Sequence, residues 1–330
     1  MTSPRVLRLG ILGAARIAPA AAIRPARVVP EVEVVAVAAR DPLRARAFAA
    51  KHAIPRVADT YQALVEDPDI DAVYNPLPNG LHAEWTIAAL AAGKHVLCEK
   101  PFTSNALEAK AVGDVAASSG LVVMEAFHWL YHPLAQQMLQ VVHGELGALR
   151  HIEAWVAFPL FRFSDIRYDF ALGGGAMMDA GCYAVSMARF LAGEEPDVLD
   201  ARATLQREQV DRVMTSHLRF PSGLTATLHA SMWSPTMPLK VAVHAIGERG
   251  ELRVFNPIAP QAMYRLSVRG DAGRSSQWGR GRPTYGYQLA AFADAVLHGG
   301  PVLTPPAYSM ANMAVIDAVY AAAGLRLRGT

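Results

Sequence analysis

Cysteine is nearly absent from this sequence, and its scarcity narrows the class of protein. The 330 residues include two, Cys98 and Cys182, each within an apolar run. Two cysteines cannot provide a disulfide framework, so we interpret both as buried thiols and expect a reducing, cytoplasmic environment. Stability then has to come from a hydrophobic core, and 52% of the residues are hydrophobic.

The sequence also lacks a surplus of charge and a long apolar run. The formal net charge is +2, which is too mild a balance to favour nucleic acid or an anionic membrane as a partner. No uncharged apolar stretch of roughly 18 residues occurs, so we predict no membrane span. The motifs Gly-x-Ser-x-Gly and Gly-x-x-x-x-Gly-Lys-Ser/Thr are absent, so serine hydrolases and P-loop nucleotidases lack support.

A metal centre is not predicted either. Glu125, His128 and His132 are spaced like ligands on one helix face, but Pro133 and the preceding strand-like run interrupt such a helix. No cysteine or further histidine follows at ligand spacing, so we predict no zinc site. His128 keeps two interpretations, contact with a substrate or plain packing.

The first 127 residues alternate short apolar runs with helical patterns. This alternation predicts a parallel sheet covered by helices, and hence a Rossmann domain over residues 1–127. The predicted strands are Val6–Leu12, Val32–Ala39, Ala72–Pro76, His95–Cys98 and Leu121–Ala126.

The pattern changes after about residue 130, where β-rich runs follow one another with short turns. We predict an α+β domain over residues 128–330 with a large, mostly antiparallel, open sheet, so that the whole chain is of the α/β class. Residues 270–286 are rich in Gly, Arg and Ser, and we interpret them as a surface loop, with a substrate-facing flap as the alternative. Two closing helices, Tyr287–Leu297 and Tyr308–Leu325, are free to pack back on the first domain.

A dinucleotide-binding turn follows the first predicted strand. Such a turn needs a tight bend, then a small residue where the pyrophosphate approaches, then a small residue between helix and strand. Gly13, Ala15 and Ala18 occupy these places. Two of the three usual glycines are alanines, so an ordinary strand–helix turn explains these residues equally well when they are taken alone.

The end of the second strand favours NADP over NAD. A ribose-recognising residue is expected there, and NAD sites usually place an acid at that point. Here Arg40 precedes Asp41, and a guanidinium suits a ribose 2′-phosphate. The alternative is a solvated Arg40 beside an Asp41 that caps the helix starting at Pro42, and both interpretations can hold together.

Two further segments carry chemically active side chains. Glu99 and Lys100 follow a buried strand, at the edge where open α/β sheets bind ligands. A glycine triplet, Gly173 to Gly175, leads into a helix on which Asp179 and Tyr183 are four residues apart and share a face. A carboxylate and a phenol among apolar neighbours are costly unless they are used or paired.

At these positions nearly the whole chain resembles the glucose–fructose oxidoreductase / inositol dehydrogenase / MocA family. The matching segments are Gly13–Ala18, Asn75–His82, Glu99–Pro101 and Gly173–Tyr183. Many members carry histidine in place of Tyr183. Tyrosine there resembles the branch of dihydrodiol and NADP-xylose dehydrogenases, although sugar 3-ketoreductases also carry it.

The resemblance implies a sugar or cyclic polyol as substrate, NADP as cofactor and a homo-oligomer formed through the C-terminal sheet. It implies catalytic roles for Lys100, Tyr183 and Asp179, with His128 and Arg167 added among the substrate contacts. His82 is either a neighbour of the cofactor or a helix-cap residue. The implied cofactor contacts are Gly13, Ala15, Arg16, Ile17, Arg40, Pro76, Leu77, Asn79, His82, Glu99 and Lys100.

Elementary chemistry supports the same pair. Hydride leaves a carbinol carbon for the nicotinamide while a base takes the hydroxyl proton. A free tyrosine has a pKa of about 10, and a neighbouring ammonium lowers that pKa. We therefore predict Tyr183 as acid/base with Lys100 beside it, and Asp179 as a group that holds a substrate hydroxyl or orients Lys100. A ketosugar reductase and a non-catalytic NADP-binding sensor remain as alternatives.

Overall fold

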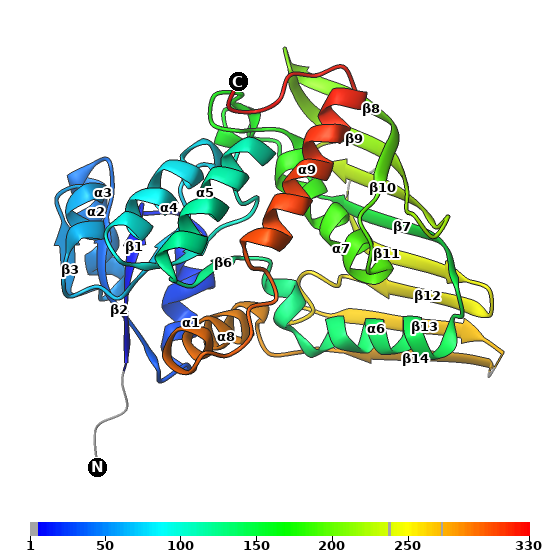
Figure 1. Cartoon of the computed structure of the whole chain (residues 1–330), viewed down its shortest axis with the longest axis horizontal. Coiled ribbons are helices and arrows are strands. Elements are labelled where there is room, and N and C mark those ends of the chain that lie inside the picture. The colour runs from blue at the N-terminus through cyan, green and yellow to red at the C-terminus, as the bar shows by residue number, and fades with distance from the viewer. Residues whose placement is uncertain (1–5, 237–238, 272) are drawn as a thin grey trace. The chain divides into compact units, whose positions relative to one another are not determined.

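We describe the fold from a computed structural model of the chain, shown in Figure 1. The structure describes residues 6–236, 239–271 and 273–330. The chain divides into two compact units, residues 1–131 with 285–310 and residues 132–284 with 311–330. Within the described ranges, no helix combines the length and the apolar composition needed to cross a membrane.

The first unit is built on a six-stranded parallel sheet. Its strand order is β3-β2-β1-β4-β5-β6, which is the order of doubly wound dinucleotide-binding folds. Leu7, Leu9, Ile11 and Leu12 of β1 are almost completely buried, as expected for a strand covered on both faces. The strands are β1 (Leu7–Leu12), β2 (Val32–Ala38), β3 (Arg56–Ala58), β4 (Ala72–Asn75), β5 (His95–Cys98) and β6 (Val123–Glu125).

Helices with clear sequence-encoded starts connect these strands. Asn105, for example, accepts a hydrogen bond from the amide of Glu108 at 2.9 Å and so caps α5. A π-helical turn, Pro19–Ile23, precedes α1 (Arg24–Ala26). The other helices of this unit are α2 (Pro42–His52), α3 (Tyr61–Glu66), α4 (His82–Ala91), α5 (Ala106–Ser119) and most of α8 (Thr284–His298).

The second unit contains an eight-stranded sheet of order β14-β13-β12-β11-β7-β10-β9-β8. Strands β7 and β10 pair in parallel, and every other neighbouring pair is antiparallel. The predicted fold class is therefore confirmed. The strands are β7 (Leu149–Ala157), β8 (Asp197–Arg207), β9 (Val210–Arg219), β10 (Thr225–Ser231), β11 (Lys240–Gly247), β12 (Gly250–Phe255), β13 (Tyr264–Gly270) and β14 (Gly273–Gly279).

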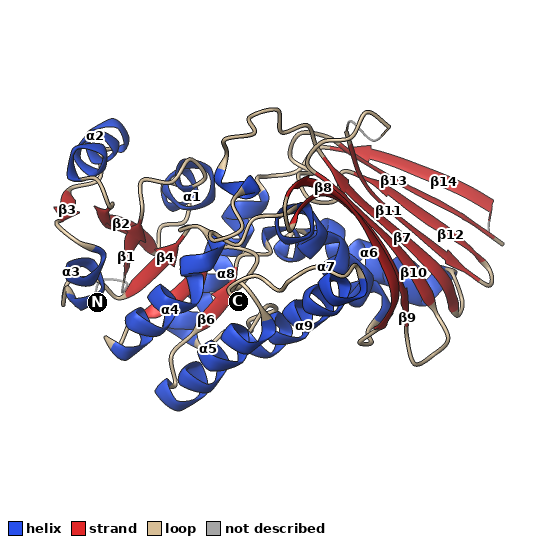
Figure 2. Ribbon diagram, turned by 90° about the horizontal axis from the view of Figure 1, so that it is seen from above, coloured by secondary structure: helices blue, strands red, loops and turns tan. Residues whose placement is uncertain are grey.

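The two faces of this sheet differ in polarity because polar and apolar residues alternate along its strands. In β10, Ala226 and Leu228 are buried, whereas Thr227 and His229 point to the other face and are partly exposed. Figure 2 shows α6 (Pro133–Glu145) and α7 (Cys182–Ala192) along one face of the sheet. The last helix, α9 (Pro306–Ala322), begins in the first unit and continues into the second.

One sequence-based expectation is wrong. Residues 273–279, which we expected to lie in a surface loop, form the edge strand β14 and pair antiparallel with β13. Gly, Arg and Ser have little intrinsic preference for strands, so composition alone predicted a loop. The hydrogen bonds offered by the free edge of β13 override that preference.

Candidate active site

The loop after β1 has the geometry of a dinucleotide-binding turn. Gly13 has a φ of +87°, and its amide donates to the carbonyl of Ala38 at 2.7 Å, which ties the loop to the end of β2. A Cβ atom on Gly13 would lie 3.0 Å from Leu77 Cδ2. Ala18 is completely buried just before the helical segment that begins at Pro19. The close approach and the positive φ favour glycine here, and the helix start offers amides to a phosphate.

Asp41 takes the capping role that the sequence suggested, and Arg40 lies beside it at the end of β2. Asp41 caps α2 by accepting hydrogen bonds from the amides of Leu43 and Arg44 at 2.9 and 3.3 Å. Arg40 is exposed at the carboxyl end of β2, and its own amide donates to the hydroxyl of Tyr61 at 3.3 Å. The arrangement fits a guanidinium directed at a ribose phosphate, a role that stays a prediction.

Arg44 is a candidate that sequence analysis missed. Its Nη2 donates to the carbonyl of Ala14 at 2.9 Å, so a second guanidinium lies against the dinucleotide turn. Helix α2 contains two arginines, Arg44 and Arg46, and nothing in the sequence distinguishes one from the other. Only the return of α2 toward the loop after β1 identifies it.

His82 connects the loops after β4 and β5. Its Nε2 lies 2.8 Å from the carbonyl oxygen of Leu77, and its Nδ1 lies 2.8 Å from that of Pro101. The side chain is completely buried, and burial lowers its pKa to about 4 despite the two carbonyls. His82 is also the first residue of α4. The neutral ring has one N–H and donates it to one of these two carbonyls. Because the ring lies between two backbone segments, its predicted contact with the cofactor fits an indirect role, through the segment that contains Pro76, Leu77 and Asn79.

Glu99 and Lys100 lie directly after β5. Glu99 is buried, and its Oε1 accepts a hydrogen bond from the hydroxyl of Tyr74 on β4 at 2.7 Å. Burial and the neighbouring carboxylate raise the pKa of Tyr74 well above its usual value, so Tyr74 stays a donor. Lys100 is half-buried. Sequence analysis did not predict the Tyr74–Glu99 hydrogen bond. It ties the start of the loop after β5 to β4, directly before Lys100.

His128 belongs to the surroundings of Lys100. It is buried in a one-turn helix, His128–Tyr131, and its ring centroid lies 4.1 Å from that of Tyr285. Burial lowers its pKa to about 3, and the charge of Lys100 contributes in the same direction. The burial and the ring contact of His128 fit its interpretation as a packing residue, and its contact with a substrate stays a prediction.

The second unit brings together Arg167 and Asp179. Arg167 Nε lies 2.6 Å from Asp179 Oδ2, and Arg167 Nη1 lies 3.1 Å from Asp165 Oδ1. The carboxylate of Asp179 raises the pKa of Arg167, so the guanidinium is firmly charged. Asp179 lies in the π-helical turn Met177–Gly181, and Tyr183 follows on α7 with 7% of its surface exposed. The expected pairing of Tyr183 with Lys100 joins residues of the two units and stays a prediction.

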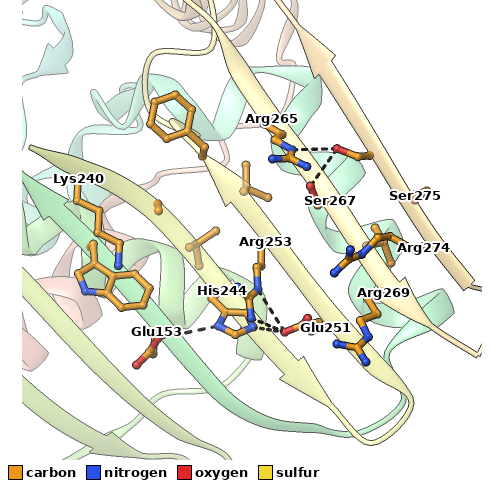
Figure 3. A pocket seen from close by; sticks show the side chains of 17 residues that line it. Glu153, Lys240, His244, Glu251, Arg253, Arg265, Ser267, Arg269, Arg274 and Ser275 are labelled. Atoms are coloured by element: carbon orange, nitrogen blue, oxygen red, sulfur yellow. Dashed lines mark hydrogen bonds and ion pairs between the residues drawn. The ribbon is translucent and has the colours of Figure 1, made fainter.

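A hollow of about 810 Å³ lies elsewhere, over β7 and β11 to β14. Figure 3 shows its side chains, including Arg265, Arg269 and Arg274. Among the residues that line it, His244 Nε2 lies 2.7 Å from Glu251 Oε2, and His244 Nδ1 lies 3.9 Å from Glu153 Oε2. None of the predicted cofactor, substrate or catalytic residues lines this hollow, so we do not identify it with the active site.

Two family models match the chain. The model of an oxidoreductase family with an NAD-binding Rossmann fold, GFO/IDH/MocA, matches residues 7–127. The model of the GFO/IDH/MocA C-terminal domain matches residues 135–253. Together the two matches cover the whole first sheet and strands β7 to β11 of the second, in the order predicted.

Individual relatives extend the likeness over the full chain. The chain is 39% identical to a D-xylose 1-dehydrogenase (NADP(+)) of Haloferax volcanii, covering 96% of this chain and 97% of the relative. It is 32% identical to a dTDP-3,4-didehydro-2,6-dideoxy-α-D-glucose 3-reductase of Actinomadura kijaniata, covering 95% and 94%.

The solved structure of a 3-ketoreductase from Actinomadura kijaniata with NADP and TDP-benzene is similar throughout. It superposes with a TM-score of 0.88 at 30% sequence identity, covering 96% of this chain and 98% of that one. The predicted resemblance is thereby confirmed by sequence and by fold. The chain belongs to the GFO/IDH/MocA family of oxidoreductases.

Proposed function

We propose that the chain transfers a hydride between NADP and a hydroxyl-bearing or keto carbon of a sugar-like substrate. The observation that carries the proposal is the meeting of three loops at the carboxyl edge of one parallel sheet. Gly13 after β1 approaches Leu77 after β4, and His82 ties Leu77 to Pro101 beside Lys100. Ligands of open α/β sheets bind at this edge.

The relatives agree with the cofactor and with the reaction class. The predictions of NADP and of oxidoreductase activity on sugar-like hydroxyl or keto groups are confirmed by a xylose dehydrogenase that uses NADP and by a ketoreductase solved with NADP. Within this chain, the exposed Arg40 at the end of β2 is the proposed contact of the 2′-phosphate. The proposed pyrophosphate contacts are the backbone amides of the Gly13 turn.

The proposed chemistry assigns the proton to Tyr183. When bound, the nicotinamide accepts or supplies the hydride. The phenolate of Tyr183 takes the proton of the substrate alcohol during oxidation, and the resulting phenol returns that proton to the substrate oxygen during reduction. The ammonium of Lys100 holds the same substrate oxygen and favours the phenolate of Tyr183.

Asp179 and Arg167 form the proposed contact with further substrate hydroxyls. Their 2.6 Å ion pair presents a carboxylate and a guanidinium that are already oriented before substrate arrives. Arg167 keeps 39% of its side chain exposed, whereas Asp179 keeps 14%. Both side chains are therefore partly accessible to solvent, and a polyol is the substrate chemistry that such a donor–acceptor pair fits.

The direction of the reaction has two candidates. Oxidation of an aldose or a trans-dihydrodiol is the first, and reduction of a ketosugar is the second, favoured by the 3-reductase relatives. A nucleotide-binding sensor without turnover is a different class of function. The chain has both Lys100 and Tyr183, and this pair favours an enzyme.

Assembly and location complete the proposal. The open face of the eight-stranded sheet has charged side chains of both signs, among them Glu153, Glu251 and Arg253. We propose that this face pairs with a second copy of the chain, in a cytoplasmic homodimer or larger homo-oligomer. Light scattering tests the assembly: a species of 35.5 kDa alone at micromolar concentration contradicts it.

A rate survey tests the function. Aldoses, inositols, dihydrodiols and ketosugars are each offered with NADP or NADPH, and nicotinamide absorbance is followed. We expect turnover with at least one class, and faster turnover with NADP than with NAD. Tight NADP binding without turnover of any class supports the sensor instead.

A further inference from the structure

A buried arginine that no motif includes lies against the glycine triplet of the second unit. Arg328 has no exposed surface, although it follows the last helix in a short irregular segment. Its Nε donates to the carbonyl of Gly174 at 2.6 Å, and its Nη1 donates to the carbonyl of Arg326 at 2.8 Å. Its Nη2 donates to Asp211 Oδ1 at 3.0 Å. The guanidinium thus connects three separate segments of the unit.

Asp211, on β9, is the centre of this network. Its Oδ1 also accepts a hydrogen bond from the hydroxyl of Tyr320 at 3.0 Å, and its Oδ2 accepts one from the amide of Met177 at 2.7 Å. The guanidinium carbon of Arg328 lies 4.0 Å from the ring centroid of Tyr320. Gly174 and Met177 are therefore held from the same ion pair, one on each side of Gly175.

Gly175 has no room for any other residue. Its φ is +140°, and a Cβ atom there would lie 2.3 Å from Asp211 Oδ1 and 2.5 Å from the hydroxyl of Tyr320. The amide of Gly175 donates to the carbonyl of Arg167 at 2.9 Å, and its own carbonyl accepts from the amide of Asp179 at 3.0 Å. The backbone of the loop thus joins both members of the Arg167–Asp179 pair to the buried ion pair.

We infer that Arg328 and Asp211 are positioning residues, which fix the glycine triplet and thereby the directions in which Asp179 and Tyr183 project. This inference rests on the proposed function, because it gives the two residues a purpose only if Asp179 and Tyr183 act on substrate. A tyrosine that exchanges a proton with a bound oxygen has to be held to within a fraction of an ångström, and a displacement of about 1 Å can cost a hundredfold in rate.

Stability alone is a weak reason for such a pair. Removing two charges from water is costly, and apolar replacements of buried ion pairs are often neutral or stabilising. The guanidinium and the carboxylate, by contrast, supply directional bonds to Gly174 and Met177 that apolar side chains cannot replace. Such directional hydrogen bonds can fix the orientation of the helix start, and therefore of the Tyr183 side chain, more tightly than apolar packing can.

A double-mutant cycle tests the inference. Arg328→Met is measured in the wild-type background and in Tyr183→Phe, with kcat, KM for the sugar, the NADP dissociation constant and the melting temperature followed. We expect kcat to fall on the order of 10²-fold in the wild-type background and little further in Tyr183→Phe, because no proton donor is left to position. NADP affinity should stay unchanged, because its proposed contacts belong to the first unit.

Control and companion variants separate this effect from a loss of fold. Arg326→Met removes an exposed charge from the same segment, and we expect it to keep kcat. Arg328→Lys retains the positive charge but lacks the planar guanidinium with its several N–H donors. If Arg328→Met does not fold, Arg328→Lys replaces it in the double-mutant cycle. We expect its kcat to lie between those of the wild type and of Arg328→Met.

The possible outcomes separate the two proposals. A full additional loss of kcat in the Tyr183→Phe background, or a lower melting temperature with unchanged kcat, overturns the positioning role alone. Wild-type turnover by Tyr183→Phe overturns the proposed chemistry instead, and this inference with it.

Discussion

The two units place their candidate functional residues on different parts of their sheets. In the first unit, Gly13, Arg40, Leu77 and Lys100 all follow carboxyl ends of parallel strands. In the second unit, Asp179 and Tyr183 lie on a glycine-loop–helix segment, and Asp211 on β9 accepts a hydrogen bond from the amide of Met177 in that segment. A parallel sheet gathers its loops at one edge by topology, whereas in the second unit a buried ion pair, Arg328–Asp211, contacts the backbone of the glycine-loop–helix segment.

This difference suggests a division of labour between the units. The strand-end loops of the first unit offer backbone amides and a guanidinium, which are groups that bind a dinucleotide. The helix of the second unit presents a phenol and a carboxylate, which are groups that exchange protons and hold hydroxyls. Substitution of Tyr183 should therefore lower kcat, and substitution of Arg40 should weaken NADP binding. Lys100, which belongs to the first unit, is the exception, because its proposed role is in the chemistry of Tyr183.

The largest effect is expected at Tyr183. Tyr183→Phe removes one hydroxyl and keeps the ring, so kcat should fall by about 10²–10⁴-fold with NADP affinity unchanged. Lys100→Met should cost a similar factor, and the double variant should be little slower than either single one. Steady-state kinetics and cofactor titration measure both constants. A Tyr183→Phe enzyme that loses NADP affinity but keeps its kcat would break the comparison.

The next largest effect is expected at Arg40. Arg40→Ala removes one charge-assisted contact, so binding of NADP should weaken by about 1.5–3 kcal/mol while binding of NAD changes little. The matched control is Arg46→Ala, which changes another exposed arginine, on α2. We expect this variant to bind NADP as the wild type does. Calorimetric titration with each nucleotide decides the matter. Equal affinity of the wild-type protein for NAD and NADP excludes the assignment.

Acid should destabilise the first unit through its buried histidines. Burial lowers the pKa of His82 to about 4 and that of His128 to about 3, both below the ordinary value of 6.5. The folded state therefore binds fewer protons than the unfolded chain once the pH drops below 6.5. The stability contributed by the two neutral histidines is fully present above pH 6.5. As the pH falls, each histidine lowers the free energy of unfolding by about 1.4 kcal/mol per pH unit, until the pH reaches its folded-state pKa.

Thermal melts from pH 7 to pH 4.5 measure this loss. His82→Gln removes one of the two titrating groups, so its melting temperature should depend less steeply on pH. His298→Gln changes an exposed histidine of the first unit and should leave the slope as it is in the wild type. A slope that His82→Gln leaves unaltered contradicts the buried, neutral state of that ring.

The smallest effect is expected at Asp41, the residue next to Arg40. Asp41→Ala removes the cap of α2 and should cost about 1 kcal/mol of unfolding free energy. The preference for NADP over NAD should persist, because the cap faces the amides of Leu43 and Arg44. Chemical denaturation and cofactor titration on one preparation give both values. Loss of the NADP preference in this variant would show that the cap of α2, and not Arg40 alone, determines the choice of cofactor.

The sequence predicted those parts of the site that local patterns encode. The Gly13 turn, the strand end at Lys100 and the glycine triplet each combine a periodic run with a break, and such breaks determine where a loop begins. The cap by Asp41 was likewise predictable from Pro42 beside it. These features depend on residues within a few positions of one another.

Features that depend on distant residues escaped prediction. Asp211 and Arg328 are 117 residues apart, and neither lies in a recognisable motif. The hydrogen bond between Tyr74 and Glu99 depends on the parallel pairing of β4 with β5. Strand β14 depends on the free edge of β13. In each case the interaction comes from a residue or strand that is distant in sequence, so the local sequence pattern cannot predict it.

Transfer of a labelled hydride tests the central claim most directly. NADPH deuterated at the transferable position of its nicotinamide is incubated with the chain and a panel of ketosugars, and the products are examined by mass spectrometry and NMR. The account predicts one deuterium on the new carbinol carbon, with the label lost from the nucleotide and its transfer slowed strongly in Tyr183→Phe. A protein that binds both NADPH and a ketosugar of the panel, yet moves no deuterium to its keto carbon, contradicts it.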